Sequence, residues 1–383
     1  FDADCRRAKR ELWAKRRQLH SDCQSLAREY QKMCRRKRAE CSEREMLDRI
    51  SRAEIGSPFQ LVKPKQRSTA AVVPQEELSR HFERLLVKED SDQWAVSQAG
   101  TITPVTEQEL LDAFGSVKKR KALGADCIAG EHLTASYQTL KGCWKKIFDH
   151  CLKFKVIPTV WRQSMLCLIF KGKGRPEEAV NYRGISLLCT AYKTFTKIVK
   201  NRLEGLTKDL ISDEQYGFRR SRSTFDAIST LIKATQQAMT KPRAKMYCLF
   251  VDFTTAFDSV NRGLLLKKLK QRYEVDDGLL NMICCLLRPN LITFKHEQCQ
   301  CGRFHGQQTQ IEQNVGVMQG DSLSPLLFIL FIDDLVVEIK KSRNSTKILL
   351  YADDTALYTE NRDDLRTSMK VLEDWCRRNE IKI

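Results

Sequence analysis

The sequence predicts an α+β fold in which helices back an antiparallel sheet, and a long basic helical arm precedes this body. An uninterrupted apolar run at 246–251 has the length of a buried strand and ends at Asp252. Two further apolar runs, 348–351 and 356–358, flank a four-residue turn as the arms of a hairpin. The segments with apolar residues at helical spacing between and after these strands are 262–273 and 363–379.

The first 55 residues are expected to form the arm. Residues 1–52 contain 16 Lys or Arg against 9 Asp or Glu, with no Gly or Pro, which predicts a long amphipathic helix. Glu40 interrupts the apolar stripe and argues against a sustained coiled coil. A basic run at 35–38 is typical of a solvated helix face, with a nucleic-acid contact or a nuclear import signal as alternatives. The apolar residues that recur in sevens are Leu12, Leu19, Leu26, Met33 and Leu47.

Residues 56–74 are predicted to be a linker because glycine and three prolines break the helical pattern there. Residues 75–160 are predicted to be a helical N-terminal extension, with a first helix running to Val87. Thr106 and Glu109 have the spacing of a capping box and predict the start of a second helix.

Three carboxylates stand at the ends of apolar runs: Asp252 after the first run, and Asp353 and Asp354 in the hairpin turn. Carboxylates beside apolar strands are penalised by desolvation and repel one another, so they need a cation to stay charged. Oxygen ligands of this kind suit Mg²⁺, which completes its shell with water and substrate phosphates. Two such ions about 3.5 to 4 Å apart can activate an attacking hydroxyl and stabilise a leaving oxygen. The set predicts phosphoryl transfer, although Asp252 alone is more typical of a turn cap.

Between the acidic sites, the segment from Gly316 to Pro325 precedes an apolar helical run at 326–332. A glycine turn, a Ser cap and the proline are expected to start this helix. Gly320 allows a backbone to approach a ligand closely, and Gln319 offers both a donor and an acceptor. Alone, the segment predicts only a helix entry.

Spaced blocks of the sequence carry a family resemblance. They are Lys171-Gly172-Lys173, Asn181 to Leu188, Gln215 to Arg219, Asp252, Gln319-Gly320 and Tyr351 to Asp354. In these blocks and their order, the chain from about Thr106 to Ile383 resembles the reverse transcriptases of non-LTR (LINE-type) retrotransposons. The Tyr-Ala-Asp-Asp block separates this family from RNA-templated RNA polymerases, which usually carry Gly-Asp-Asp. One departure is Gly184, which stands where the common Arg-Pro-Ile-Ser box has proline.

The resemblance implies the fold of a right-hand polymerase palm and fingers. Residues 161–383 would hold the fingers and palm, with fingers built from about 106 to 240 and the acids on the palm sheet. In the family, the strand expected at 381–383 leads to an Asn-x-x-Lys segment, a primer grip and a helical thumb. Because none of these follows, we expect a piece of a longer polyprotein with the thumb absent, and the sequence leaves open whether this piece polymerises alone.

The resemblance also implies the metal ligands and the reaction. Asp252 and Asp353 are similar to the family's two metal ligands, Asp354 stands beside them as a further or alternate ligand, and Phe253 belongs to the same set. The implied cofactor is a pair of Mg²⁺ ions, for which Mn²⁺ is an alternative. The implied enzyme is an RNA-directed DNA polymerase, in which a primer 3′-hydroxyl attacks the α-phosphate of a dNTP and pyrophosphate leaves.

Substrate contacts follow from the same resemblance. Phe257 is similar to the steric gate, an aromatic ring that leaves no room for a ribonucleotide 2′-hydroxyl. Ala352 would sit against the primer terminus. Arg183, with Lys171 or Lys173, is similar to the fingers contact to the triphosphate, a role that needs fixed positive charge. The other implied contacts are Gln319 and Gly320, which would line the nucleotide and template base, and Arg219.

Charge and composition restrict the partners. The formal net charge of +18 indicates an anionic partner, although a solvated basic surface gives the same value. No apolar span of 18 residues occurs, so no membrane partner is expected. The resemblance implies an RNA template, a DNA primer or target DNA, and dNTPs, with a nuclear location and a cytoplasmic ribonucleoprotein stage.

The 15 cysteines are scattered without regular spacing, so free thiols in a reducing compartment are expected. One cluster, formed by His296, Cys299, Cys301 and His305, offers four soft ligands within ten residues. Zinc is not favoured there, because the gap between the two cysteines is shorter than structural zinc sites use.

Two other functions stay open from the sequence. An RNA-binding or ribonucleoprotein-assembly module that has lost synthesis is favoured by the missing thumb, but the acids, Phe257 and Arg183 occur together and argue against it. A different palm nucleotidyltransferase, such as an RNA polymerase, would not discriminate between sugars at Phe257.

Overall fold

The computed structural model describes residues 73–88, 99–242, 244–294 and 310–383, together with Arg7, 29–34 and 36–37. The chain divides into two compact units, Phe1–Ser68 and Thr69–Ile383, so the division falls inside the predicted linker. In the first unit, the described residues are helical. Most of the predicted arm and linker lies outside the described residues, as do the predicted cluster residues His296, Cys299, Cys301 and His305.

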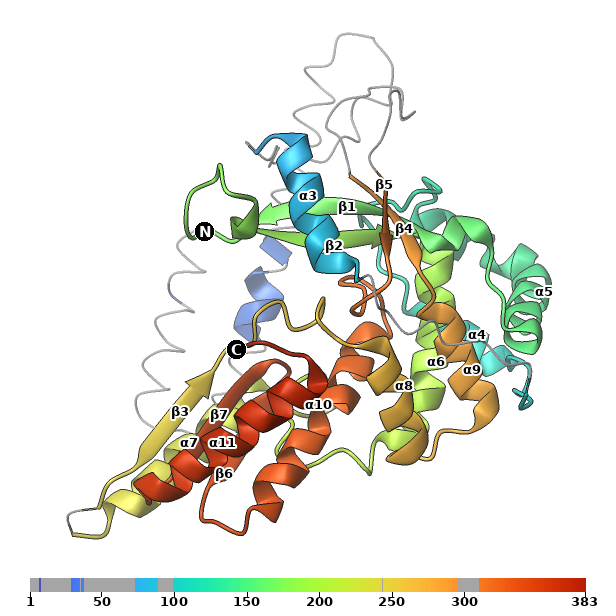
Figure 1. Ribbon diagram of the computed structural model, residues 1–383. Coiled ribbons are helices and arrows are strands. Elements are labelled where there is room, and N and C mark those ends of the chain that lie inside the picture. The colour runs from blue at the N-terminus through green and yellow to red at the C-terminus, as the bar shows by residue number, and fades with distance from the viewer. Residues whose placement is uncertain are drawn as a thin grey trace. The chain divides into compact units, whose positions relative to one another are not determined.

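The predicted antiparallel sheet backed by helices is present in the second unit. Its strands are β3 (Tyr247–Val251), β7 (Asp354–Thr359) and β6 (Lys347–Tyr351), in the order β3-β7-β6 and all antiparallel. The helices α10 (Ser324–Lys341) and α11 (Arg362–Asn379) pack against this sheet, as Figure 1 shows for α11. Buried side chains of α10, nearly all apolar, form the centre of the larger core.

A second sheet combines two strands from the segment predicted as fingers with two strands from beyond residue 240. It has the order β2-β1-β4-β5, with β1 (Gln163–Phe170) antiparallel to β2 (Tyr182–Leu188) and parallel to β4 (Asn290–Phe294). β5 (Gln310–Gln313) closes the sheet as the antiparallel partner of β4. The sequence did not predict this sheet.

The helix α3 (Gln75–Leu86) packs on this second sheet and explains the departure at Gly184. A Cβ atom at Gly184 would lie 2.8 Å from Phe82 of α3 and 2.9 Å from Leu166 of β1. Carbon atoms do not approach so closely without a shift of their neighbours, so the packing of α3 requires glycine at this position. The helix ends one residue before the predicted Val87.

The second unit contains further α-helices and short 3-10 helices besides α3, α10 and α11. The predicted capping box is confirmed, because Thr106 and Glu109 exchange hydrogen bonds between side chain and backbone at the start of α4. None of the described helices combines the length and the apolar composition that crossing a bilayer requires. The other described helical elements are α4 (Glu107–Gly115), α5 (Gly130–Phe154), η2 (Thr159–Arg162), η3 (Ala179–Asn181), α6 (Thr190–Thr207), α7 (Thr224–Met239), α8 (Arg262–Gln271) and α9 (Asp277–Leu286).

One predicted helix start is wrong in detail. The helix α10 begins at Ser324 with Pro325 in its first turn, but its N-cap is Leu323, and no side chain caps it. At the end of the chain, the predicted strand is a single bridge, in which the Thr254 amide donates to the Lys382 carbonyl at 2.8 Å.

Candidate active site

The first sheet brings the three predicted acids to one of its ends. Tyr351 of β6 pairs with Asp354 of β7, so Ala352 and Asp353 form a two-residue turn. Val251 of β3 pairs with Thr355 of β7. Asp252 is the next residue after Val251 and therefore lies one step beyond the ladder, opposite Asp354, where cross-strand side chains are close neighbours. Acids that are a hundred residues apart in the sequence thus meet beside the turn.

Electrostatics confirms that the acids influence one another. Burial raises the pKa of Asp353, and the nearby carboxylates of Asp354 and Asp252 raise it further, whereas Arg183 opposes the shift. Within the described ranges, no three His, Cys, Asp or Glu side chains converge closely enough to hold a metal by themselves. That arrangement fits Mg²⁺, which is held by one or two carboxylates and takes its other oxygens from water and phosphates.

Phe257 is fixed by aromatic neighbours. Its ring stacks on Phe328 of α10 with 4.5 Å between centroids and meets the edge of Phe218 at 6.4 Å. The Phe257 carbonyl accepts a hydrogen bond from the Val317 amide at 2.9 Å, which ties the loop after β3 to the segment before α10. Phe218 is 53% exposed. The Phe257 ring is thus half-buried and held in place by its neighbours, five residues after Asp252.

Gln319 connects the two sheets. Its side-chain nitrogen donates to Asp258 Oδ2 at 2.7 Å, and its carbonyl accepts from the Ser186 amide of β2 at 2.8 Å. Gly320 has φ +122°, and a Cβ there would lie 2.5 Å from the Ser186 carbonyl. The predicted close approach at Gly320 is therefore present, although the backbone that approaches is the chain's own β2.

The predicted fingers cations differ in their surroundings. Arg183 is exposed on β2, and its side chain makes no hydrogen bond or ion pair with another described residue. Burial raises the pKa of both Asp353 and Asp258, and the charge of Arg183 opposes this rise, so Arg183 faces these acids. Lys171 also acts on Asp258, and its Nζ donates to the Val180 carbonyl at 2.7 Å. Lys173 is exposed, and the choice between Lys171 and Lys173 stays a prediction.

Two other predicted site residues have mainly structural surroundings. The Arg219 guanidinium donates to the backbone carbonyls of Ser212 at 2.8 Å and Lys208 at 3.3 Å, so it holds its own loop against the end of α6. The Phe253 ring is 3% exposed and packs near Trp375. Only the backbone oxygen of Phe253 is therefore chemically able to serve a metal.

Sequence reasoning missed two polar residues of this region. Asp258 accepts a hydrogen bond from Gln319, and burial raises its pKa from 3.8 to about 7 against the opposing effects of Gln319, Arg183 and Lys171. Gln215 was quoted only as part of a block, but its side chain contacts the turn that carries Asp353. Neither residue had a local signal, because both lie in segments that contain several other polar residues.

Comparisons with known proteins identify a family for this chain. The family described as reverse transcriptase (RNA-dependent DNA polymerase) matches residues 170–383. A probable RNA-directed DNA polymerase from transposon BS of Drosophila melanogaster is 28% identical over 309 residues, which cover 77% of this chain and 33% of that protein. The Pol polyprotein of the R2 element of Nasonia vitripennis is 26% identical, covering 70% of this chain and 25% of that protein. The chain spans about a third or less of the length of these relatives.

Solved structures give a more distant likeness. Telomerase from Candida tropicalis, truncated from its C-terminal domain, is 14% identical with a TM-score of 0.42 and covers 63% of this chain and 52% of that chain. The resemblance to reverse transcriptases of mobile elements that the sequence predicted is confirmed by the family match and by the named relatives.

Proposed function

Because the chain belongs to the reverse transcriptase (RNA-dependent DNA polymerase) family, which matches more than half of its residues, we propose that it joins dNTPs to a primer 3′-hydroxyl on an RNA template. The observation that supports this most directly is the meeting of Asp252, Asp353 and Asp354 at one end of the β3-β7-β6 sheet. Burial, and after it the charges of Asp354 and Asp252, raise the pKa of Asp353, and a divalent cation would relieve this penalty.

Asp252 and Asp353 would hold Mg²⁺, with Asp354 and the Phe253 carbonyl beside them. Bound there, Mg²⁺ would lower the pKa of the primer hydroxyl and stabilise charge on the leaving oxygen. The protein's own contribution is position and charge, which supply most of the catalysis in phosphoryl transfer.

The surrounding residues would select and hold the nucleotide. Arg183 and Lys171 are the cations that face the acids, so we assign them to the triphosphate. The Phe257 ring, held against Phe328, would lie under the sugar and exclude a 2′-hydroxyl. Gln319, whose amide is oriented by Asp258, would contact the incoming nucleotide or the template base.

A lysine stripe on α6 supports a polyanionic partner. Lys193, Lys197 and Lys200 recur at intervals of four and three residues and so share one helix face. The pKa of Lys197 is lowered by burial first and then by the charges of Lys200, Arg220 and Lys118, so cations from three segments gather there. The carbonyl of Lys193 accepts from Ser322, which joins the stripe to the Gln319 turn.

Primer extension on poly(rA)/oligo(dT) with Mg²⁺ tests the proposal. The wild type should incorporate dTTP, and Asp353→Asn should lose activity by a factor of about 10³ or more because a metal ligand is neutralised. Asp209→Asn, at a carboxylate that is 86% exposed, is the matched control and should extend normally. Template binding without extension in both the wild type and the control would favour a binding module instead.

The choice of sugar is tested at Phe257. Phe257→Val removes the ring that would meet the 2′-hydroxyl, so the ratio of kcat/KM for dTTP to that for UTP should fall by about 10-fold to 100-fold. Phe154→Ala, at an exposed ring on α5, serves as the control. An unchanged ratio in Phe257→Val would show that another residue, or none, selects the sugar.

A further inference from the structure

We propose that Gln215 is a positioning residue, which fixes the turn that carries Asp353 because its side-chain oxygen accepts a hydrogen bond from the Ala352 amide. The inference rests on the proposed function of that turn. Gln215 makes no described hydrogen bond to any of the three acids, so it acts on them only through the turn.

The segment around Gln215 extends the palm sheet at its β6 edge. Gln215 forms a parallel bridge with Leu350 of β6. The Tyr216 amide donates to the Leu350 carbonyl at 2.8 Å, and the Leu350 amide donates to the Glu214 carbonyl at 2.9 Å. Residues 214–216 therefore lie against the last residues of β6, directly before the Ala352-Asp353 turn.

The Gln215 side chain binds the turn itself. The residue is fully buried, and its Oε1 accepts from the Ala352 amide at 3.0 Å and from the Gly217 amide at 2.8 Å. Both neighbours of this atom are donors, which fixes the orientation of the side-chain amide. Gln215 Oε1 thus joins the Ala352-Asp353 turn to the segment that contains Gln215 and Gly217.

The backbone at this contact is strained and crowded. Ala352 has φ +58°, a left-handed conformation that non-glycine residues keep only when the surrounding structure enforces it. A Cβ at Gly217 would lie 2.3 Å from the Ala352 nitrogen, so only glycine permits the approach. Gln215 Oε1 is therefore part of what enforces the conformation of Ala352, and with it the direction of Asp353.

Stability alone does not explain a glutamine here. Its Nε2 is buried without a hydrogen-bond partner among the described residues, which costs free energy that an apolar side chain would avoid. Glutamine does supply a neutral acceptor of sufficient length, whereas a glutamate would bury a negative charge beside the Ala352-Asp353 turn. The requirement is for a neutral acceptor beside the acids.

Gln215→Met tests the inference, because methionine has a similar length and no amide oxygen. We expect Mn²⁺ affinity, measured by calorimetry, to fall about tenfold, and kcat to fall about 10-fold to 100-fold with a smaller change in KM for dTTP. Hydrogen exchange should increase in the peptide that contains Ala352 more than in peptides from α10 or α11. Gln215→Glu keeps the acceptor but buries a charge, so exchange at Ala352 should increase less than in Gln215→Met.

Gln313→Met is the matched control, since Gln313 is equally buried but donates only to the Val315 carbonyl, at 2.9 Å. It should leave Mn²⁺ affinity and exchange at Ala352 unchanged. Unchanged exchange at Ala352 in Gln215→Met, or an equal increase throughout the body, would overturn the positioning role. Metal affinity and exchange need no DNA synthesis, so a wild type that binds Mn²⁺ without extending primers would contradict the proposed function alone.

Discussion

At the scale of single residues, Asp258 connects the two sheets through chemistry that depends on pH. Its carboxylate accepts from Gln319, and Gln319 in turn accepts from the Ser186 amide of β2. Burial raises the Asp258 pKa to about 7 in the folded chain, against 3.8 for an ordinary aspartate. The charged form of this residue is therefore disfavoured by folding.

The sign of this shift gives a stability prediction. An acid whose folded pKa is raised stabilises the fold fully below pH 4 and loses that contribution as pH rises toward 7. Asp258→Asn stays neutral, so its free energy of unfolding relative to wild type should increase by about 2 to 3 kcal/mol from pH 5 to pH 8. Denaturant titrations across this range measure it.

The control for that measurement is Asp209→Asn, whose carboxylate is 86% exposed. Its stability difference from wild type should stay flat over the same pH range. A flat difference in Asp258→Asn as well would show that Asp258 is ionised throughout and that Gln319 and the nearby cations outweigh burial.

The sequence predicted the acids but not the residues that hold their surroundings in place. Asp252 and Asp353 stand at the ends of apolar runs, and this signal is contained within a few adjacent residues. Gln215 and Asp258 acquire their roles from partners 137 and 61 residues away in the chain. No local pattern encodes such partners, so only the folded chain shows them.

At the scale of elements, the same distinction separates the two sheets. The β6-β7 hairpin and the strand β3 were predicted because alternation and apolar runs are local properties. The second sheet was missed because β1 pairs in parallel with β4, which follows more than a hundred residues later. The helix α3, which covers this sheet, comes from the N-terminal end of the second unit.

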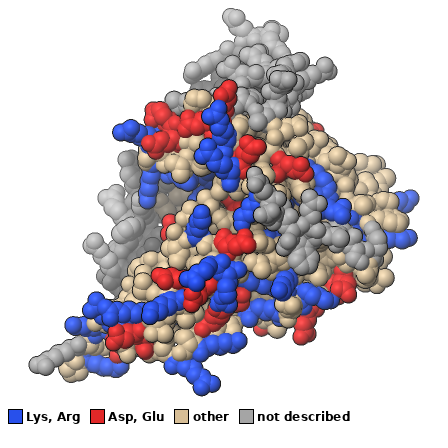
Figure 2. Space-filling view, viewed as in Figure 1, with Lys and Arg blue, Asp and Glu red and all other residues tan. Residues whose placement is uncertain are grey.

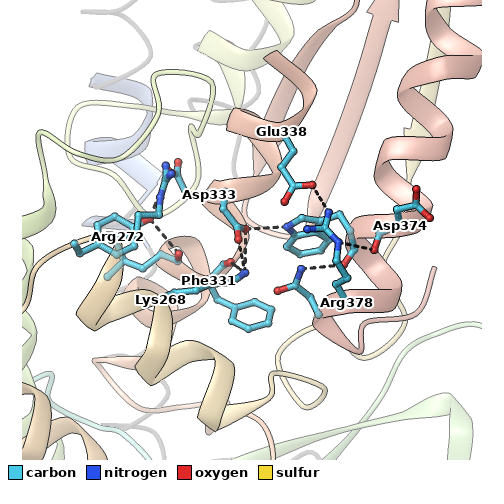
Figure 3. A network of polar contacts seen from close by, with 12 residues as sticks. Lys268, Arg272, Phe331, Asp333, Glu338, Asp374 and Arg378 are labelled. Atoms are coloured by element: carbon cyan, nitrogen blue, oxygen red, sulfur yellow. Dashed lines mark hydrogen bonds and ion pairs between the residues drawn. The ribbon is translucent and has the colours of Figure 1, made fainter. Parts of the chain in front are cut away.

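An ion-pair network joins α8, α10 and α11 behind the β3-β7-β6 sheet (Figure 3). Lys268 of α8 donates to the Phe331 carbonyl at 2.8 Å, pairs with Asp334 Oδ2 at 2.8 Å, and lies 4.2 Å from the centre of the Phe331 ring. Trp375 of α11 donates to Asp334 Oδ1 at 2.8 Å. The helix that follows the Asp252 loop is thereby fixed to both helices that back the sheet.

Removing the lysine should destabilise the fold. Lys268→Met leaves Asp334, whose side chain is 24% exposed, without its cation, and we expect a loss of about 3 kcal/mol and a lower thermal midpoint. The double variant Lys268→Met/Asp334→Asn should recover part of the loss, because no unpaired charge remains.

Lys270→Met on the same helix is the matched control. The Lys270–Asp277 pair is 49% and 55% exposed, so its loss should change stability by at most about 0.5 kcal/mol. If Lys268→Met proved as mild as this control, the network would contribute no more than a surface ion pair.

At the scale of the whole molecule, the net charge of +18 is distributed unevenly and with acids interspersed. On the face that Figure 2 shows, Lys and Arg side chains form a band across the lower half of the view, with Asp and Glu among them. Neutralising pairs such as Lys340–Glu214 remove part of the charge. In the α6 stripe, Lys193 and Lys197 make no ion pair with any described residue, so their charge is available to phosphates.

This availability predicts how binding depends on salt. Each phosphate contact contributes about 0.7 to 0.9 to the slope of log K against log salt concentration, through release of counterions. Lys193→Gln/Lys197→Gln should therefore lower the slope by about 1.5 for an RNA/DNA template-primer, measured by anisotropy between 50 and 300 mM KCl. The matched pair Lys141→Gln/Arg366→Gln removes two exposed cations elsewhere, on α5 and α11, and should leave the slope unchanged. Equal slopes for both double variants would show that nucleic acid does not reach the α6 stripe, and that the charge of the chain acts only as a general attraction.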